Sequence, residues 1–184
     1  MSYVAETALL GAVDLTSVDP TGPGAVNLVA GTGSGRAAFP GEIIRGYDPI
    51  YGAGEFIFLK GVASLAVGDW VTYNALTGAT TRWAGTANTG SPLAVAISTP
   101  SSSQWGWFQI SGNAVATCSG TVTAGDAAFY SATAAVKTAA VAGKQVLNCV
   151  AALANGGTPS GGSALASTLA VYTINRPFVQ GQIT

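Results

Sequence analysis

The segment Gly46–Tyr73 (GYDPIYGAGEFIFLKGVASLAVGDWVTY) contains apolar runs with almost no polar positions between them. In its central run, EFIFLK, the two-residue period of a β-strand places Phe56 and Phe58 on one face. Ile57 and Leu59 then lie on the opposite face, so both faces are apolar, unlike those of a strand with one side in water. Such a strand lies between two covered faces or presents one face to another chain.

Similar short apolar runs, separated by Gly, Pro, Asn and Ser, predict strands along most of the chain. These runs are Ala25–Ala30, Asp69–Tyr73, Thr80–Ala84, Leu93–Ser98, Gln104–Ser111 and Thr168–Ile174. The period of two places Trp105 and Trp107 on one face of their strand, and Phe108 and Ile110 on the other. The pattern predicts a mainly β fold, a compact β-sandwich or small β-barrel of about eight to ten short strands.

A faint internal repeat relates two parts of the chain. Gly68–Tyr73 (GDWVTY) is echoed by Gly125–Tyr130 (GDAAFY), and Ala94–Ile97 by Val150–Leu153. Each half is expected to run strand, hairpin, strand, loop, strand. The Gly-Asp pair should form a turn in which the Asp carboxylate accepts local backbone N–H groups. Ala132–Ala142 has helix propensity, but its place in the repeat favours a strand and a turn.

The two ends of the chain differ from its centre. Residues 1–41 are broken by prolines and glycines, and we expect an extended N-terminal arm that lies on a neighbouring molecule. A disordered linker is the alternative, in which the apolar residues of this region would serve no purpose. Residues 42–174 are expected to form the β-rich domain. Residues 175–184 are expected to form a tail, in which Pro177 ends regular pairing and apolar side chains seek burial against another subunit.

Charged residues are scarce, which narrows the classes of partner. Asp, Glu, Lys and Arg make up 8% of the chain, and the net charge is −1; typical soluble domains are about 25% charged. Such a surface opposes association poorly, which favours a chain that works within an assembly. We expect no nucleic-acid partner, because phosphate binding needs clustered cations, and no membrane partner, because no long uninterrupted apolar segment occurs. The N-terminus lacks a basic region, which predicts synthesis in a cytoplasm.

The residues that usually carry chemistry are missing or do not form recognisable patterns. The chain contains no histidine, the commonest general base and metal ligand. Cys118 and Cys149 match no metal-binding or redox spacing and are expected to be small buried thiols. Gly31–Arg36 lacks the spacing of either phosphate-binding glycine loop. We therefore expect a protein without enzymatic activity, with no catalytic residue, bound metal or cofactor.

Three features leave functional alternatives open. Asp48 and Glu55 resemble a glycosidase carboxylate pair only superficially, and chance proximity is favoured. Trp105 and Trp107 could stack on a sugar if exposed, although core or interface positions explain them as well. Six of the fifteen charged residues lie between Arg36 and Lys60. They form either a solvated edge with weak salt bridges or a docking surface whose opposite charges set the register of a partner.

Three motifs carry a family resemblance. Gly46–Phe56 (GYDPIYGAGEF), Gly68–Tyr73 (GDWVTY) and Trp105–Gly112 (WGWFQISG) resemble small proteins encoded beside the major capsid proteins of tailed bacteriophages, the head decoration or cement proteins. The similarity runs from about Pro40 to Arg176–Val179 and leaves the long Gly/Pro-rich N-terminal region unmatched. The resemblance implies a β-rich knob, commonly trimeric, that sits where capsomers meet and locks the shell after expansion. It implies no active-site residues.

From the residues and the resemblance together, we expect a structural virion protein on the capsid exterior, a homotrimer that bridges neighbouring major capsid subunits. The alternative is a carbohydrate- or receptor-binding module on the virion surface. The candidate interface residues are Arg36, Phe39, Arg45, Tyr47, Tyr51, Arg176, Phe178 and Val179. The expectation depends on the apolar strands and both ends finding burial against neighbouring molecules.

Overall fold

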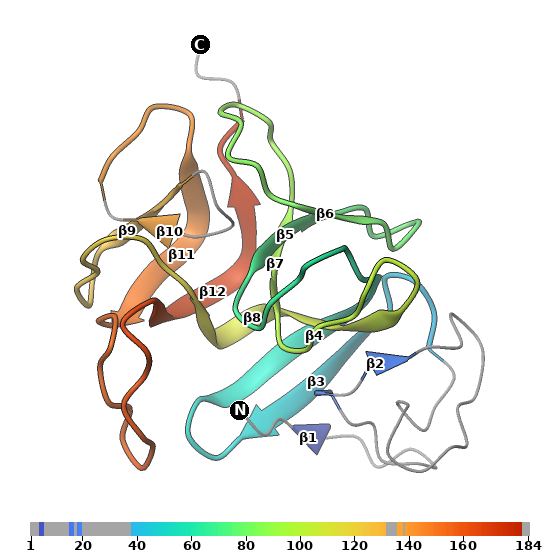
Figure 1. The fold of residues 1–184 in the computed structure, drawn as a ribbon, viewed down its shortest axis with the longest axis horizontal. Helices are drawn as coiled ribbons and strands as arrows, with labels where there is room; N and C mark the ends of the chain where they lie inside the picture. Colours follow the sequence, from blue (N-terminus) through green and yellow to red (C-terminus); the bar gives the residue numbers. More distant parts are fainter. Residues whose placement is uncertain are drawn as a thin grey trace.

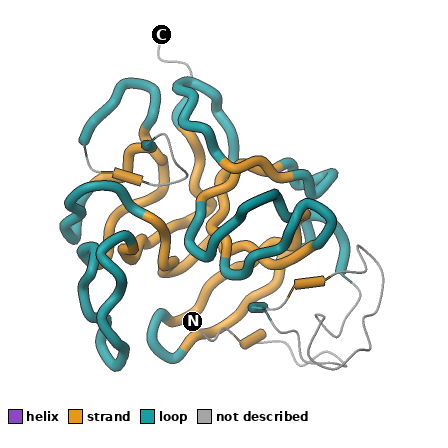
Figure 2. The backbone as a smooth tube through the Cα atoms, in the orientation of Figure 1, coloured by secondary structure: helices purple, strands orange, loops and turns teal. Residues whose placement is uncertain are grey.

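A computed structural model describes residues 4–5, 15–16, 18–19, 38–131, 136–137 and 139–181, and they form a mainly β fold, as predicted (Figures 1 and 2). The strands are β1 (Val4–Ala5), β2 (Val18–Asp19), β3 (Ile43–Asp48), β4 (Gly52–Lys60), β5 (Trp70–Tyr73), β6 (Thr80–Arg82), β7 (Leu93–Ala96), β8 (Trp105–Thr117), β9 (Ala127–Tyr130), β10 (Val136–Lys137), β11 (Gln145–Leu153) and β12 (Leu169–Val179). In these residues no helix is long and apolar enough to cross a bilayer.

The strands form one antiparallel sheet that curls into a half-barrel around β8 (Figure 1). Its main order is β1-β3-β4-β8-β12-β11-β9-β10, and β7, β5 and β6 branch from β8 in that order. Strand β8 pairs with β4 through Gly112 and with β12 from Ser111 onward. Gly112 has a φ of +94°, and a Cβ there would collide with the carbonyl oxygen of Ala53. Only glycine therefore fits where β8 passes from one partner strand to the other.

Both faces of β4 are covered by the chain itself. Phe56 and Phe58 pack in a cluster with Trp107, whereas Ile57 and Leu59 pack in a second cluster on the opposite face. The predicted facing of these side chains is confirmed, and so is the facing of Trp105 and Trp107 against Phe108 and Ile110 in β8. The expectation that these aromatic strands need a neighbouring molecule for burial is wrong. Burial of each large side chain within the protomer stabilises it by about 1.5–3 kcal/mol.

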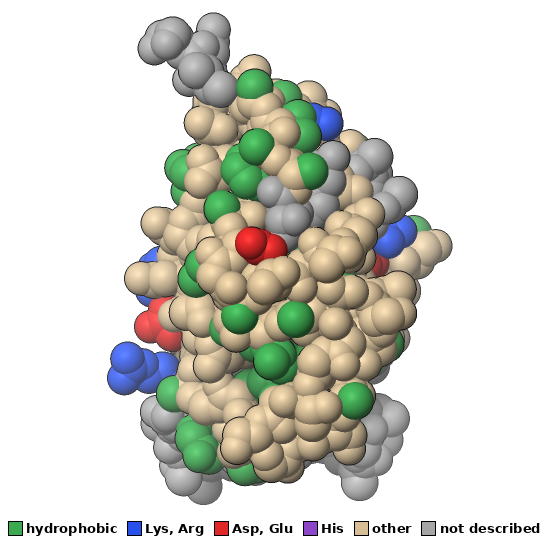
Figure 3. All heavy atoms as spheres, turned by 90° about the vertical axis from the view of Figure 1, so that its left-hand side faces the viewer, with side chains coloured by type: hydrophobic (Ala, Val, Ile, Leu, Met, Phe, Trp, Pro, Cys, Tyr) green, Lys and Arg blue, Asp and Glu red, His purple; other side chains and the backbone are tan. Residues whose placement is uncertain are grey.

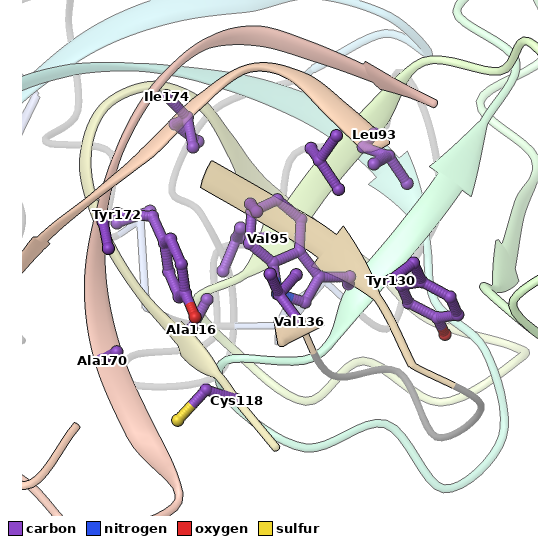
Figure 4. Close-up of a cluster of buried hydrophobic side chains, with 14 of the residues drawn as sticks. Leu93, Val95, Ala116, Cys118, Tyr130, Val136, Ala170, Tyr172 and Ile174 are labelled. Atoms are coloured by element: carbon purple, nitrogen blue, oxygen red, sulfur yellow. The ribbon is translucent and has the colours of Figure 1, made fainter. Parts of the chain in front are cut away.

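A third and larger cluster fills the space between β5, β7, β8 and the β9–β12 strands (Figure 4). Its centre includes Trp70 and Tyr172, whose rings meet edge to face with centroids 5.8 Å apart. Tyr172 and Val136 point into the same cluster in Figure 4 although they come from β12 and β10. This cluster joins the two halves of the internal repeat.

The described parts of the N-terminal arm pack on their own domain. β1 pairs with β3 at Tyr47 and Gly46, and β2 pairs with β8 at Gly106 and Trp105. Leu15 is fully buried in the cluster that contains Phe56 and Phe58. The predicted strand at residues 25–30 and most of the arm lie outside the described residues. For the residues that are described, contact with the protomer replaces the expected contact with a neighbour.

Half of the expected C-terminal tail, residues 175–179, belongs to strand β12. Strand β12 continues through Pro177 to Val179, and Phe178 and Val179 pair with β11. The next pair along the two strands joins Cys149 to Ile174, which leaves a single residue of β11, Asn148, opposite residues 175–177 of β12. The extra residues of β12 form a bulge. Proline is tolerated in such a bulge because no ladder hydrogen bond is required from its nitrogen. The prediction that Pro177 ends pairing is therefore wrong.

The first Gly-Asp turn of the repeat has the predicted chemistry. The N–H of Gly68 donates to the carbonyl of Ala96, and the N–H of Ala96 donates back to the carbonyl of Asp69. The Asp69 carboxylate accepts a hydrogen bond from the backbone N–H of Ala66 at 3.0 Å. Gly68 has a φ of +92°, which favours glycine.

The second Gly-Asp turn repeats these bonds. The N–H of Gly125 donates to the carbonyl of Ala151, which donates its own N–H to the carbonyl of Asp126. The Asp126 carboxylate accepts the N–H of Thr123 at 2.7 Å, and Gly125 has a φ of +91°. The strands that follow also correspond, since β5 pairs with β6 and β7 while β9 pairs with β10 and β11. The internal repeat is therefore a repeat of structure.

A third turn of this kind went unrecognised in the sequence. Gly41 exchanges hydrogen bonds with Phe58 in the same pattern through the carbonyl of Glu42, and the Glu42 carboxylate accepts the N–H of Phe39 at 3.1 Å. Gly41 has a φ of +76°. The longer Glu side chain makes the same bond, so the underlying signal is Gly followed by either acid.

Candidate interaction surface

The described residues contain no recognisable reaction centre. They include no group of three or more Cys, Asp and Glu side chains that could hold a metal ion. Asp48 is 2% exposed, and its carboxylate accepts the backbone N–H groups of Ile50 and Tyr51. Glu55 forms an ion pair with Arg176. Both carboxylates of the imagined glycosidase pair thus have partners within the protomer.

The tryptophan pair does not form an exposed stacking platform. Trp107 is 1% exposed. Trp105 is partly buried and stacks on Phe58 with ring centroids 5.7 Å apart. A sugar ring needs an open aromatic face, so these two side chains serve the core.

The structure separates the candidate interface residues into three groups. Phe39, Arg45, Tyr47, Arg176 and Phe178 are exposed. Tyr51 and Val179 are buried within the protomer, which removes them from any accessible surface. Arg36 lies outside the part of the chain that the structure describes.

One row of polar residues crosses four neighbouring strands. Arg45 on β3 is paired with Glu55 on β4, Glu55 with Ser111 on β8, and Ser111 with Asn175 on β12. Directly paired residues of antiparallel strands project from the same face. The guanidinium of Arg176, next to this row, reaches back across β8 and lies 3.2 Å from the Glu55 carboxylate. We call these five residues the charged row.

Exposed apolar side chains flank the charged row. Ile43 and Tyr47 lie two residues before and after Arg45 on the same face of β3, and they are 41% and 50% exposed. A shallow open depression lies between the strands, lined by Arg45, Ala53, Gly54, Glu55 and Ser111. Ile57, the partner of Ile43, already belongs to the buried cluster on this face. The charged row therefore lies at the boundary between the part of this face that the chain itself covers and the part that is exposed to solvent.

The charge of Arg176 acts on Tyr73, a residue that packs against the buried cluster on this face. Burial raises the pKa of the Tyr73 hydroxyl, and the positive charge of Arg176 opposes that shift. Arg45, by contrast, forms no ion pair or side-chain hydrogen bond with any residue that the structure describes. Two guanidinium groups thus lie beside one carboxylate, and within the described part of the chain only that of Arg176 is paired.

The backbone at Arg176 is strained. Its φ is +50°, a left-handed conformation, which costs about 1–2 kcal/mol for a residue with a side chain. The Arg176 side chain is 59% exposed, and an exposed ion pair stabilises a protein by only about 0–1 kcal/mol. The ion pair with Glu55 does not offset the strain. The conformation is imposed by the bulge that places residues 175–177 of β12 opposite one residue of β11.

A second exposed surface has a different character. Leu147 on β11 is directly opposite Phe178 on β12, and each is 38% exposed; Val150 on β11 is 41% exposed. The residues opposite Val150, Ala127 and Thr173, are uncharged. We call Leu147, Val150 and Phe178 the apolar face. Figure 3 draws the molecule from the side of β9 and β11 and shows scattered hydrophobic side chains with few charged ones.

The sequence pointed to part of both surfaces. Arg45, Tyr47, Arg176 and Phe178 were candidates, whereas Glu55 was considered only as half of a carboxylate pair with Asp48 and as one charge among several. Its pairing with Arg45 follows from the β3–β4 hairpin, whose turn the Asp-Pro motif indicates. Leu147 and Val150 could not be identified, because no sequence signal showed where β11 begins or where its bulge lies.

No known protein family, curated protein or solved structure matches this chain.

Proposed function

We propose that this protein is a non-enzymatic structural component of a bacteriophage virion, which decorates the outside of the capsid and bridges neighbouring major capsid subunits. The observation that carries the proposal is the pair of exposed surfaces, the charged row with its apolar flanks and the apolar face, on a domain whose core is otherwise complete. The resemblance of Gly46–Phe56 and Trp105–Gly112 to head decoration proteins supports the capsid as partner.

The physical basis of the bridging is burial of apolar surface on a rigid β scaffold. A stable protein interface buries about 1,200–2,000 Å² in total, which needs more than one cluster of side chains. The charged row crosses β3, β4, β8 and β12, and the apolar face lies on β11 and β12. One surface can contact a capsid subunit while the other contacts a second copy, which is consistent with the homotrimer that we include in the proposal.

The test is reconstitution. Purified protein is added to expanded capsid shells assembled without it, and bound protein is measured by co-sedimentation together with the temperature at which the shells break. We expect saturable binding in a fixed ratio to capsid subunits and a higher breaking temperature. Absence of binding to the shells at micromolar protein contradicts the proposal. Native mass spectrometry of the free protein measures the copy number.

A further inference from the structure

The charged row has the chemistry of a specific docking site. Cations are scarce in this chain, with seven Lys and Arg in 184 residues, yet Glu55 is directly opposite Arg45 on the neighbouring strand and forms an ion pair with Arg176. Arg45 is exposed and unpaired among the described residues, and Arg176 is held there by a strained bulge. The flanking Ile43 and Tyr47 offer apolar contact on either side of Arg45.

We infer that the charged row and its flanks bind an extended segment of the major capsid protein that carries a carboxylate between apolar side chains. This inference rests on the proposed function. The carboxylate of the segment pairs with Arg45 beside the depression, which Glu55 and Ser111 also line. The apolar side chains of the segment lie on Ile43 and Tyr47.

Charge complementarity decides between this occupant and a second copy of the chain. A second copy docking by the same surface would offer Arg45 only the Glu55 carboxylate, which is already paired with Arg176, so the Arg45 guanidinium would gain no carboxylate that is free. The apolar face consists of uncharged side chains and suits self-association. An acidic segment instead provides Arg45, which has no partner among the described residues, with a carboxylate. A guanidinium binds a carboxylate well because the two groups can form two parallel hydrogen bonds.

The spacing of the exposed side chains on β3 also suits a partner segment in extended conformation. Side chains at Ile43, Arg45 and Tyr47 project with the two-residue period of a strand. A partner segment in extended conformation has the same period, so that one apolar, one acidic and one further apolar side chain meet the three positions. Selectivity then comes from the central pair, and contact area from the two outer pairs.

The experiment measures binding of the full-length protein to the same capsid shells, with matched charge and apolar variants. We expect Arg45→Glu to weaken binding by about tenfold or more, because it places like charge against the carboxylate of the segment. Lys60→Glu, at the exposed end of the neighbouring strand β4, makes the same change in net charge and should alter affinity less than about twofold. Tyr47→Ala should weaken binding, whereas Leu76→Ala, at a side chain that is 88% exposed on another loop, should not.

Arg176→Gly separates docking from folding. Glycine relieves the left-handed strain at this position, so the melting temperature should stay the same or rise while binding to the shells weakens. A fall in melting temperature without loss of binding would show that Arg176 is structural and would overturn its place in the site.

The outcomes also separate this inference from the proposed function. If the unmodified protein binds the shells and Arg45→Glu binds as well as it does, the docking site is wrong and the capsid function stands. Equal losses for Arg45→Glu and Lys60→Glu would indicate unspecific attraction and overturn the site. If the unmodified protein does not bind, the proposed function itself fails.

Discussion

The two Gly-Asp turns have the same hydrogen bonds but different surroundings. Gly68 is buried, and a Cβ on it would lie 3.2 Å from a methyl carbon of Leu169. Gly125 is exposed, with no heavy atom within 4 Å of such a Cβ. Asp69 is 4% exposed and forms an ion pair of 2.8 Å with Arg82, whereas Asp126 is half-buried. The comparison shows that the short motif determines the turn, while packing around it determines how much stability it provides.

The two halves of the internal repeat should differ most in the stability contributed by the first residue after each Gly-Asp turn. Trp70 is fully buried, packs on Tyr172 and donates its indole N–H to the carbonyl of Thr117. Its counterpart Ala127 is exposed. We expect Trp70→Ala to lower the free energy of unfolding by about 3–5 kcal/mol, and Ala127→Ser to change it by less than about 0.5 kcal/mol. Urea denaturation measures both, and similar values for the two variants would contradict the comparison.

The turn glycines should differ next. Alanine at Gly125 adopts a left-handed conformation, which costs about 1–2 kcal/mol. Alanine at Gly68 has the same strain and also presses against Leu169, which adds about 1–3 kcal/mol from overpacking. Thermal unfolding of Gly68→Ala and Gly125→Ala, measured side by side, checks the order. An equal loss in both would mean that the space around Gly68 adjusts freely.

The turn carboxylates should show a smaller difference. Asp69→Ala removes a hydrogen bond to the Ala66 N–H and leaves the partly buried Arg82 without its partner. Asp126→Ala removes one hydrogen bond, to Thr123. Each variant loses one hydrogen bond from a backbone N–H group. The ion pair with Arg82, whose side chain is 39% exposed, adds about 0–1 kcal/mol, so Asp69→Ala should be the more destabilising of the two by about that amount. The additional variant Arg82→Ala in the Asp69→Ala background should then cost little, because the pair is already broken.

The smallest expected effect is a loss of stability at alkaline pH, which arises mainly from residues on β11 and β12. Burial raises the pKa of the Cys149 thiol on β11 to about 12 and raises the pKa of the Tyr172 hydroxyl on β12. A group whose pKa is higher in the folded protein favours folding below its unfolded pKa and loses that contribution as the pH rises. We expect the melting temperature to fall from about pH 9 upward, and Cys149→Ala to reduce this slope. If the melting temperature stayed constant between about pH 8 and about pH 11, the raised pKa values of these two groups would be contradicted.

The sequence predicts the local elements better than their partners. The two-residue period in β4 and β8 gives the correct facing of Phe56, Ile57, Trp107 and Phe108, because pleating depends on the backbone alone. It cannot show whether the second apolar face is covered by the same chain or by another. That depends on β5 and β7, which branch from β8 and close over this face.

Backbone features that need long-range context were missed for the same reason. Pro177 is normally a sign that a strand ends, yet a bulge opposite Asn148 accommodates it within β12. The strain at Arg176 follows from that bulge and has no signature in the residues around it. The candidate surface was therefore predictable as a set of charges near Arg45, but the row that links Arg45 to Arg176 requires the register of four strands.

Strand β12 is synthesised after every other described strand, but it lies between β8 and β11 in the interior of the sheet. While the ribosome is still making the loop before Leu169, both of these strands have an open edge that can pair with another nascent chain. Closure of the sheet thus has to wait until β12 has been synthesised, as expected for sheets built from distant segments. A chain truncated before β12 would present two unprotected edges at once, so ribosome stalling at that point is the stage at which this protein is most exposed to aggregation.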